Sequence, residues 1–222
     1  MPRGFTELEQ RRIRARLQQA GRDILGRRGV RKTTIDELAS AAGISKGSFY
    51  RFYTGKEALA LELLAAWERG FHDGIAERFS THAPQGREAC AAQLAAVFLE
   101  DFPQQIAVSG IAGLFDPQEM AWLVQRARPA DVQRMDEQDL RLFDRLRPLL
   151  AAAGVVPCVD DLEIVAALRL LFEAGTGMMG TVQGGPLTAA HYRQGFILLV
   201  EGLLQRCFSE SGQGAARGDR NE

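Results

Sequence analysis

Two short helices with a glycine between them are the feature of this sequence that most constrains its fold. Residues Thr34 to Glu37 form a capping box, in which the Thr hydroxyl and the Glu carboxylate each satisfy a main-chain amide at a helix start. That helix is expected to end around residues 41–42, because Gly43 supplies the conformation that a turn needs. Ser45 can cap a second short helix that continues to about residue 52. Two short helices joined by a tight turn form the helix-turn-helix unit.

The two faces of this unit differ in polarity. Apolar residues fall where they would face inward, and these are Leu38, Ala42, Ile44, Phe49 and Phe52. The outward positions of the second helix carry polar hydrogen-bond donors, namely Ser45, Lys46, Ser48 and Arg51. A purely structural helical hairpin seldom places Lys, Gly, Ser and Tyr on one short exposed face. The pattern therefore favours a helix that reads DNA in the major groove over a structural hairpin.

Charge is divided unevenly along the chain. Residues 1–56 hold 13 Lys or Arg and 5 Asp or Glu, a net charge of +8, whereas the remaining residues carry −9 and the whole chain −1. A near-neutral total alone argues against a nucleic-acid partner. The asymmetry, however, is typical of a nucleic-acid-binding segment attached to an acidic body. A solvated basic helix is the alternative, and charge alone does not choose between the two.

Helical patterns run through the rest of the chain and predict an all-α fold. One apolar face, formed by Ile13, Leu17, Ala20 and Ile24, marks a first helix that ends near residue 28. No strand pattern and no internal repeat are found, and the polar residues 209–222 are expected to be a disordered tail. Pro103 is expected to close the helix that precedes it. The later helices are predicted over residues 54–79, 86–102, 104–114, from Asp116 onward, 130–153, 160–180 and 188–208.

The segment TTIDELASAAGISKGSFYRFYTGKEAL, residues 33–59, resembles the DNA-binding signature of TetR-type transcriptional regulators. The resemblance covers the chain from the first helix to Leu59, and the remainder matches only in its expected helical architecture. It implies an N-terminal three-helix DNA-binding domain over residues 1–55 and a helical effector-binding and dimerisation domain over residues 56–208, followed by the tail at 209–222.

The resemblance also implies which residues contact DNA. Thr33 and Thr34 lie at a helix N-terminus, where a phosphate is favoured. Gly47 lets the second helix approach the bases, and Ser48 and Arg51 can reach base edges in the major groove. The full set of expected DNA-contacting residues is Thr33, Thr34, Ser45, Lys46, Gly47, Ser48, Tyr50, Arg51, Tyr53 and Lys56.

One position departs from the family pattern. The family often has Tyr or His where this chain has Phe52, and Phe where it has Tyr53. Because Phe52 cannot donate a hydrogen bond, either Tyr53 makes that phosphate contact or the contact is missing. The departure keeps a second hypothesis open, in which the chain is a ligand-binding or protein-interaction module that has lost sequence-specific DNA binding.

A palindromic operator on double-stranded DNA requires a two-fold dimer with its recognition helices about one DNA turn apart. Similar regulators pair their last two long helices, here 160–180 and 188–208, with those of a second copy in a four-helix bundle. An internal hairpin is the alternative for these two helices. The candidate dimer-interface residues are Val165, Leu168, Phe172, Phe196, Val200 and Leu203.

The resemblance further implies a small-molecule effector whose binding releases the operator. Aromatic and Met residues at helical spacing could line its pocket, although the same pattern is typical of an ordinary core. The candidate pocket residues are Trp67, Phe71, Phe102, Phe115, Trp122, Phe143, Phe172 and Met178. We therefore predict a homodimeric transcriptional regulator, most simply a repressor, whose effector the sequence does not identify.

Other functional classes find little support. The GxGxxG pattern from Gly175 to Gly180 follows a helical run, whereas a dinucleotide site needs a preceding strand, so close helix packing explains these glycines better. His72, His82 and His191 share no metal-ligand spacing. We accordingly expect no enzyme activity, no cofactor and no metal.

The cysteines and the apolar runs suggest the compartment. Cys90, Cys158 and Cys207 are odd in number and widely spaced, and are expected to be small apolar core residues of a reducing compartment. No apolar run is long enough to span a membrane, and no secretory signal is recognised. A cytoplasmic location without membrane contact is the resulting expectation.

Overall fold

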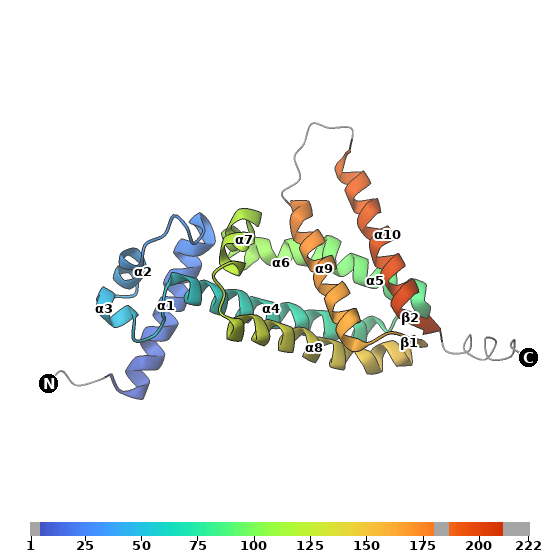
Figure 1. Cartoon of the computed structure of the whole chain (residues 1–222), viewed down its shortest axis with the longest axis horizontal. Helices are drawn as coiled ribbons and strands as arrows, with labels where there is room; N and C mark the ends of the chain where they lie inside the picture. Colours follow the sequence, from blue (N-terminus) through green and yellow to red (C-terminus); the bar gives the residue numbers. More distant parts are fainter. Residues whose placement is uncertain (1–4, 180–186, 211–222) are drawn as a thin grey trace, which may run out of the picture. The chain divides into compact units, whose positions relative to one another are not determined.

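The computed structural model of the chain describes residues 5–179 and 187–210, without the side chains of residues 178 and 179. The described residues are almost entirely helical, which confirms the predicted all-α class (Figure 1). The chain forms two compact units, the first from residues 1–68 and 105–133 and the second from residues 69–104 and 134–222. The division falls inside the long helix α4 (Lys56–His82), and the first unit also includes a segment from the middle of the chain.

The first unit begins with α1 (Glu7–Arg28), α2 (Ile35–Ala41) and α3 (Lys46–Phe49). The side chains of Ile13, Leu17 and Leu25 on α1 are buried, as are Leu38 on α2 and Phe49 on α3. These apolar contacts hold the three helices around one small core. The predicted inward face of the helix-turn-helix therefore packs as expected, except that Ile44 and Phe52 are only partly buried.

The same unit contains α7 (Pro117–Val124), a 3₁₀ turn at Ala112–Phe115, and parts of α6 (Phe102–Val108) and α8 (Pro129–Ala152). The predicted cap at Asp116 is confirmed, because its carboxylate accepts hydrogen bonds from the main-chain N–H groups of Gln118 and Glu119. Two glycines make this segment pack closely on α1. A Cβ atom added at Gly26 would lie only 1.8 Å from the carbonyl oxygen of Gly110, and one added at Gly113 would lie 2.5 Å from the carbonyl oxygen of Gly26.

The second unit is built from the remainder of α4 and α8 together with α5 (Gly86–Ala96), α9 (Asp161–Met179) and α10 (Ala189–Cys207). Here α10 packs against α5 and α9 (Figure 1). The prediction that Pro103 ends a helix is wrong. A π-helical turn at Val97–Asp101 precedes Pro103, and the helix continues as α6. A wider turn of this kind accommodates a residue that has no N–H to donate.

A short two-stranded ribbon corrects the expectation that the chain has no strands. Strand β1 (Val155–Pro157) pairs antiparallel with β2 (Phe208–Glu210), with Val155 opposite Glu210 and Pro157 opposite Phe208. Phe208 is buried. Residues 209 and 210, predicted to belong to a disordered tail, thus form part of the ribbon, whereas residues 211–222 lie outside the described residues.

Two further expectations can be compared with the structure. Gly175 lies within α9, and a Cβ atom there would meet Cδ1 of Phe98 at 3.5 Å, consistent with close helix packing, while Gly180 lies outside the described residues. Within the ranges that the structure describes, no helix is long and apolar enough to cross a membrane.

Candidate nucleic-acid interface

The start of α2 has the predicted capping geometry. The Thr34 hydroxyl accepts a hydrogen bond from the Glu37 N–H at 3.3 Å, and the Thr34 N–H donates to Glu37 Oε2 at 2.8 Å. Arg28 reaches the other oxygen of the same carboxylate at 2.8 Å. The hydrogen bond from the Thr34 N–H, followed by the one from Arg28, lowers the pKa of Glu37 to about 2. Glu37 is therefore ionised at neutral pH and fixes the start of the helix.

The turn and α3 present a short polar surface. Gly43 adopts a φ of +66°, a left-handed conformation that side chains rarely adopt. Ser45 caps α3, because its hydroxyl accepts a hydrogen bond from the Ser48 N–H at 3.2 Å. The structure leaves Ser45, Lys46, Gly47, Tyr50 and Arg51 exposed and Ser48 partly exposed. A Cβ added at Gly47 would have nothing closer than the Ser45 hydroxyl at 4.0 Å, so the backbone here is open to a partner.

Lys46 stands at the first position of α3 and pairs with Asp36 of α2. The distance from Lys46 Nζ to Asp36 Oδ2 is 2.8 Å, and both side chains are more than half exposed. The hydrogen bond that the Lys46 ammonium donates to the Asp36 carboxylate raises the pKa of Lys46. A surface pair of this kind contributes little to stability. The ammonium of Lys46 can therefore leave Asp36 and bind a phosphate with little loss of stability.

Two of the ten predicted DNA-contacting side chains are instead buried. Thr33 is 1% exposed, and its hydroxyl donates to the carbonyl of Gly29 at 2.8 Å. Tyr53 is 4% exposed, and among the described residues its hydroxyl has no hydrogen-bond partner. Burial raises the pKa of Tyr53, and the guanidinium of Arg14 lies 5.3 Å from its ring centre. In this structure, neither side chain can reach a phosphate.

Lys56, also predicted to contact phosphate, donates to main-chain carbonyls within its own unit. Its ammonium lies 2.7 Å from the Thr33 oxygen and 3.3 Å from the Arg31 oxygen. The ring centre of Trp122 lies 5.7 Å from the same nitrogen. Lys56 therefore holds the connection between α1 and α2, which carries Thr33, against the start of α4.

Glu119 is a residue that sequence reasoning missed. This carboxylate is 4% exposed and accepts hydrogen bonds from the Val30 N–H at 2.7 Å and the Arg31 N–H at 3.1 Å. Arg31 Nε adds a third at 2.7 Å. Burial alone would raise the pKa of Glu119, but the hydrogen bonds from Arg31 and Val30 outweigh it and lower the pKa. Nothing in the sequence signalled this contact, because the partners are 89 residues apart.

Phe52, the departure from the family pattern, contacts the beginning of the chain. Its ring centre lies 6.1 Å from that of Phe5, and the guanidinium of Arg51 lies 4.8 Å from the Phe5 ring. Phe52 therefore gives the residues before α1 an apolar contact on the α3 side of the unit. This gives Phe52 a packing role and provides no support for a lost function.

The predicted effector-pocket residues are divided between the two units. Within the second unit, Phe102 lies 5.2 Å from Phe71 and 5.1 Å from Phe172 between ring centres, in a packed aromatic cluster. Within the first unit, Trp67 packs on Phe115 at 4.8 Å. Trp122 stacks with Arg126, and Phe143 is buried beside Arg147 and Phe208. The side chain of Met178 lies outside the described residues.

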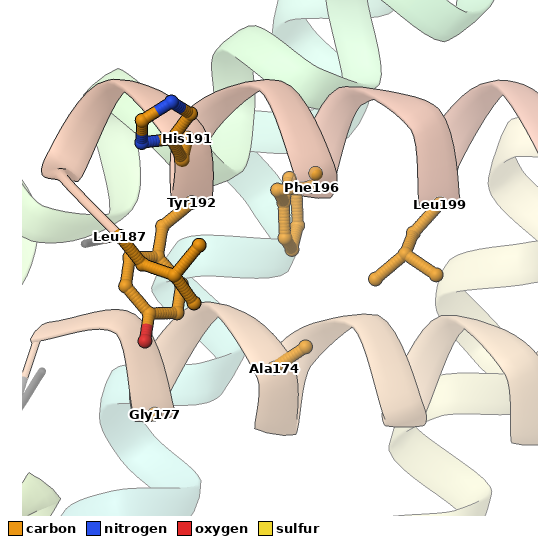
Figure 2. Close-up of a pocket in the computed structure, with 8 residues that line it drawn as sticks. Ala174, Gly177, Leu187, His191, Tyr192, Phe196 and Leu199 are labelled. Carbon is orange, nitrogen blue, oxygen red and sulfur yellow. The ribbon is translucent and has the colours of Figure 1, made fainter. Parts of the chain in front are cut away.

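An apolar groove of about 510 Å³ lies between α9 and α10 in the second unit (Figure 2). The rings of Tyr192 and Phe196 and the side chain of Leu199 extend from α10 towards α9, where Ala174 and Gly177 provide a floor without bulky side chains. His191 also lines the groove, and its Nδ1 accepts a hydrogen bond from the Thr188 N–H at 3.0 Å. Among the described residues that the sequence singled out for a site, Phe196 lines this groove.

The apolar residues of α9 and α10 divide between two faces. The predicted interface residues Val165, Phe196 and Val200 are buried, and so belong to the core of their own unit. Three more, Leu168, Phe172 and Leu203, are partly buried. The large apolar residues that are exposed in the described part of these helices are Leu162 and Leu170 on α9 and Leu198 and Leu199 on α10, each between 57% and 65% exposed. The sequence does contain a sign of these residues, because both helices carry apolar residues on more than one face. A single apolar face would suffice for packing within one unit.

Comparison with known proteins gives matches over the N-terminal region and over most of the chain. The model of the bacterial regulatory proteins of the tetR family matches residues 17–63, which span the helix-turn-helix. The HTH-type transcriptional repressor KstR2 of Mycobacterium tuberculosis is 26% identical over 200 residues, covering 87% of this chain and 93% of the repressor. KstR2 of Rhodococcus jostii is 32% identical over 78 residues, or 35% of this chain and 36% of the repressor.

Solved structures share the fold. A TetR-family transcriptional regulator from Pectobacterium atrosepticum superposes with a TM-score of 0.61 at 19% identity, covering 93% of this chain and 99% of the other. A TetR regulator from Rhodococcus sp. RHA1 gives a TM-score of 0.59 at 16% identity, covering 88% and 97% of the two chains. At these identities the likeness concerns the fold alone.

Proposed function

We propose that this chain, which is a TetR-type DNA-binding regulator, binds a palindromic operator as a homodimer and represses transcription until a small-molecule effector releases it. The observation that carries this proposal is the surface of α3. Hydroxyl, ammonium and guanidinium groups surround a bare backbone at Gly47, which is what a helix needs to lie in the major groove. Repression is proposed because the M. tuberculosis relative is named a transcriptional repressor.

The proposed contacts divide into positioning and specificity. Ser45, Lys46 and Tyr50 are exposed around α3 and are assigned to phosphates, with Thr34 at the start of α2. Ser48 and Arg51 are assigned to base edges, with Gly47 allowing the approach. Thr33, Tyr53 and Lys56 are given a supporting role, since all three side chains lie against the protein itself.

A second copy of the chain is the proposed occupant of the exposed leucines on α9 and α10. Leu170 and Leu198 are 65% and 59% exposed, and exposed apolar side chains gathered on two adjacent helices are typical of a protein–protein contact. A groove of about 430 Å³ lies beside Leu162 and Leu170 on this face, and side chains of a partner could insert into it. Because a palindrome has two equivalent halves, a two-fold pair of such surfaces provides one recognition helix for each half.

The proposed effector is a small molecule with an apolar body that enters the groove between α9 and α10. The volume of this groove falls within the range of about 300–1,000 Å³ usual for small-molecule sites. The Tyr192 hydroxyl is a polar group that could fix the orientation of a ligand there. If the effector weakens DNA binding, then DNA must weaken effector binding by the same factor.

Titration of the protein with DNA from upstream of its own gene tests the proposal. We expect this DNA to give a mobility shift. Unrelated DNA should abolish the shift only when it is present in high excess. With four phosphate contacts in each of two subunits, the logarithm of the association constant should fall with the logarithm of salt concentration with a slope of about −7. A flat salt dependence, or equal affinity for every sequence, would contradict sequence-specific operator binding.

A further inference from the structure

We propose that Cys158 and Cys207 form a reversible intramolecular disulfide when the protein is exposed to a peroxide. Neither residue is in the core, contrary to the expectation from the sequence: Cys158 is exposed and Cys207 is partly exposed. Both lie in the second unit, Cys158 shortly before α9 and Cys207 at the end of α10. A bond between them would close a covalent loop that contains α9 and α10, the two helices of the proposed dimer surface.

The ribbon places the two cysteines opposite each other. Its register pairs Pro157 with Phe208, so the next antiparallel pair is Cys158 with Cys207. One hydrogen bond continues beyond the last strand pair, since the Cys158 N–H donates to the carbonyl of Cys207, the last residue of α10, at 2.9 Å. Directly opposed residues in a hydrogen-bonded antiparallel pair have Cα atoms about 5.5 Å apart. That separation is within the range of roughly 4.4–6.8 Å found for disulfides.

The thiols differ in how readily they meet an oxidant. Cys158 Sγ lies 3.5 Å from the Arg206 carbonyl, so this exposed thiol is directed towards the end of α10. Burial raises the pKa of the Cys207 thiol, and the neighbouring Cys158 and Glu163 raise it further, although Arg206 opposes them. Cys207 is therefore protonated at neutral pH. Cys158 is the thiol that reacts first, and Cys207 resolves the product.

The chemistry balances with hydrogen peroxide as the oxidant. The Cys158 thiolate attacks one peroxide oxygen, the O–O bond breaks, and a sulfenic acid and hydroxide form. Cys207 then gives up its proton and attacks the sulfenic sulfur, so that an S–S bond forms and the S–O bond breaks with loss of hydroxide. In sum, the two thiols lose two electrons and two protons, and the peroxide becomes two molecules of water.

Cys90 provides a natural contrast within the same unit. Its side chain is 0% exposed, and burial raises the pKa of its thiol. An inaccessible thiol of this kind is slow to react. An exposed disulfide, by comparison, is the labile and regulatory kind in a reducing compartment.

The experiment treats the reduced full-length protein with hydrogen peroxide and then counts free thiols. The count should fall from three per chain to one. Trypsin without reduction separates the three cysteines, because Cys158 lies in peptide 146–169, Cys207 in peptide 207–217 and Cys90 in peptide 88–126. Mass spectrometry should find the first two peptides joined, with two hydrogen atoms fewer than their sum, and dithiothreitol should separate them.

Single-cysteine variants complete the test. Cys90→Ala should form the bond as the wild type does, whereas Cys158→Ser and Cys207→Ser should not form it. Circular dichroism of each variant establishes that it is folded before oxidation. A disulfide between two chains, a bond that includes Cys90, or three thiols that persist after treatment of the folded protein would each overturn the proposal. None of these measurements depends on DNA, so the result is independent of the proposed function.

Discussion

A single carboxylate, that of Glu119, joins two stretches of chain that lie far apart in the sequence. It receives the N–H groups of Val30 and Arg31 and the Arg31 side chain, all within 3.1 Å. These donors lie in the connection that leads into α2. The conformation of this connection therefore depends on a residue outside the helix-turn-helix, and a change at position 119 should affect the helix-turn-helix without touching its surface.

Replacement of Glu119 tests this dependence through stability and pH. Glu119→Gln keeps the shape but removes the charge, and should lower the free energy of unfolding at pH 7 by about 2 kcal/mol, the usual worth of hydrogen bonds to a charged group. Because the folded-state pKa of Glu119 is lowered, its contribution is complete above the unfolded pKa near 4.5 and is lost as the pH falls through the folded-state value. Urea unfolding at several pH values should therefore show the wild type and the variant converging in acid.

Glu77→Gln is the matched control, since Glu77 is exposed on α4. That change should alter the unfolding free energy by less than about 0.5 kcal/mol at any pH. An equal loss of stability in the two variants would show that the Glu119 contact has no special role.

Lys46 and Ser48 should have different effects on DNA binding. Lys46→Ala should weaken binding to every DNA sequence by a similar factor and reduce the salt slope by about 2, because it removes one phosphate contact from each of the two subunits. Ser48→Ala should change the preferred bases at one position of each half-site while leaving the salt slope unchanged. Binding isotherms on operator and unrelated DNA measure both quantities. The assignment of α3 as the recognition helix is wrong if both variants bind as the wild type does.

Local chemistry explains which site residues could be predicted from the sequence. Thr34 and Ser45 cap their helices through partners three residues away, so the sequence alone contains both halves of each interaction. Thr33 and Lys56 could not be placed in this way. Their hydroxyl and ammonium groups turn towards main-chain carbonyls, whose positions follow from the packing of α1, α2 and α4.

Among the helices, the approach of α1 to the segment before α7 depends on two glycines. A Cβ atom added at Gly26 would lie 1.8 Å from the Gly110 oxygen, and neither atom can turn aside, because one is main chain and the other is attached directly to it. Gly26→Ala should therefore lower the free energy of unfolding by about 1–3 kcal/mol, as overpacking does, despite the better helix propensity of Ala. Thermal or urea unfolding measures the change.

Gly70→Ala provides the comparison at the same level. Gly70 lies within α4, and a Cβ there would have no atom within 4 Å. Alanine should stabilise this helix by up to about 1 kcal/mol through propensity alone. If Gly26→Ala were also stabilising, the close approach of α1 to Gly110 would not exist in solution.

Helix starts were easier to predict than helix ends or strands. The starts at Asp116 and Thr188 depend on cap residues that the sequence displays. The passage of the helix through Pro103 depends on a π-helical turn, which has no comparable sequence pattern. The ribbon was missed because its two strands are three residues each and come from distant parts of the chain, so neither has room for a periodic pattern.

For the molecule as a whole, the proposed dimer depends on leucines that a single chain leaves exposed. Leu170→Glu and Leu198→Glu should leave the helical content unchanged, since both side chains point away from the core. Each change should shift the protein from dimer to monomer in sedimentation velocity, because a buried carboxylate would face apolar surface on the second copy. The affinity for the operator should fall as the dimer is lost.

Leu8→Glu is the control for this prediction. Leu8 is 53% exposed on α1, a helix that is not part of the proposed interface. This variant should remain a dimer. If both variants on α9 and α10 remain dimers, the second copy binds at another surface. If the wild type sediments as a monomer, the proposed dimer does not form.

The ribbon has a practical consequence for anyone who shortens or labels this protein. Phe208 is 3% exposed, and its carbonyl accepts a hydrogen bond from the Arg87 side chain, while the Glu210 carboxylate accepts one from the Arg87 N–H. A truncation that starts at residue 208 would therefore remove a core residue and two anchors of α5. A truncation after residue 210 would keep them, and an affinity tag or fluorophore attached there would be held beside β1.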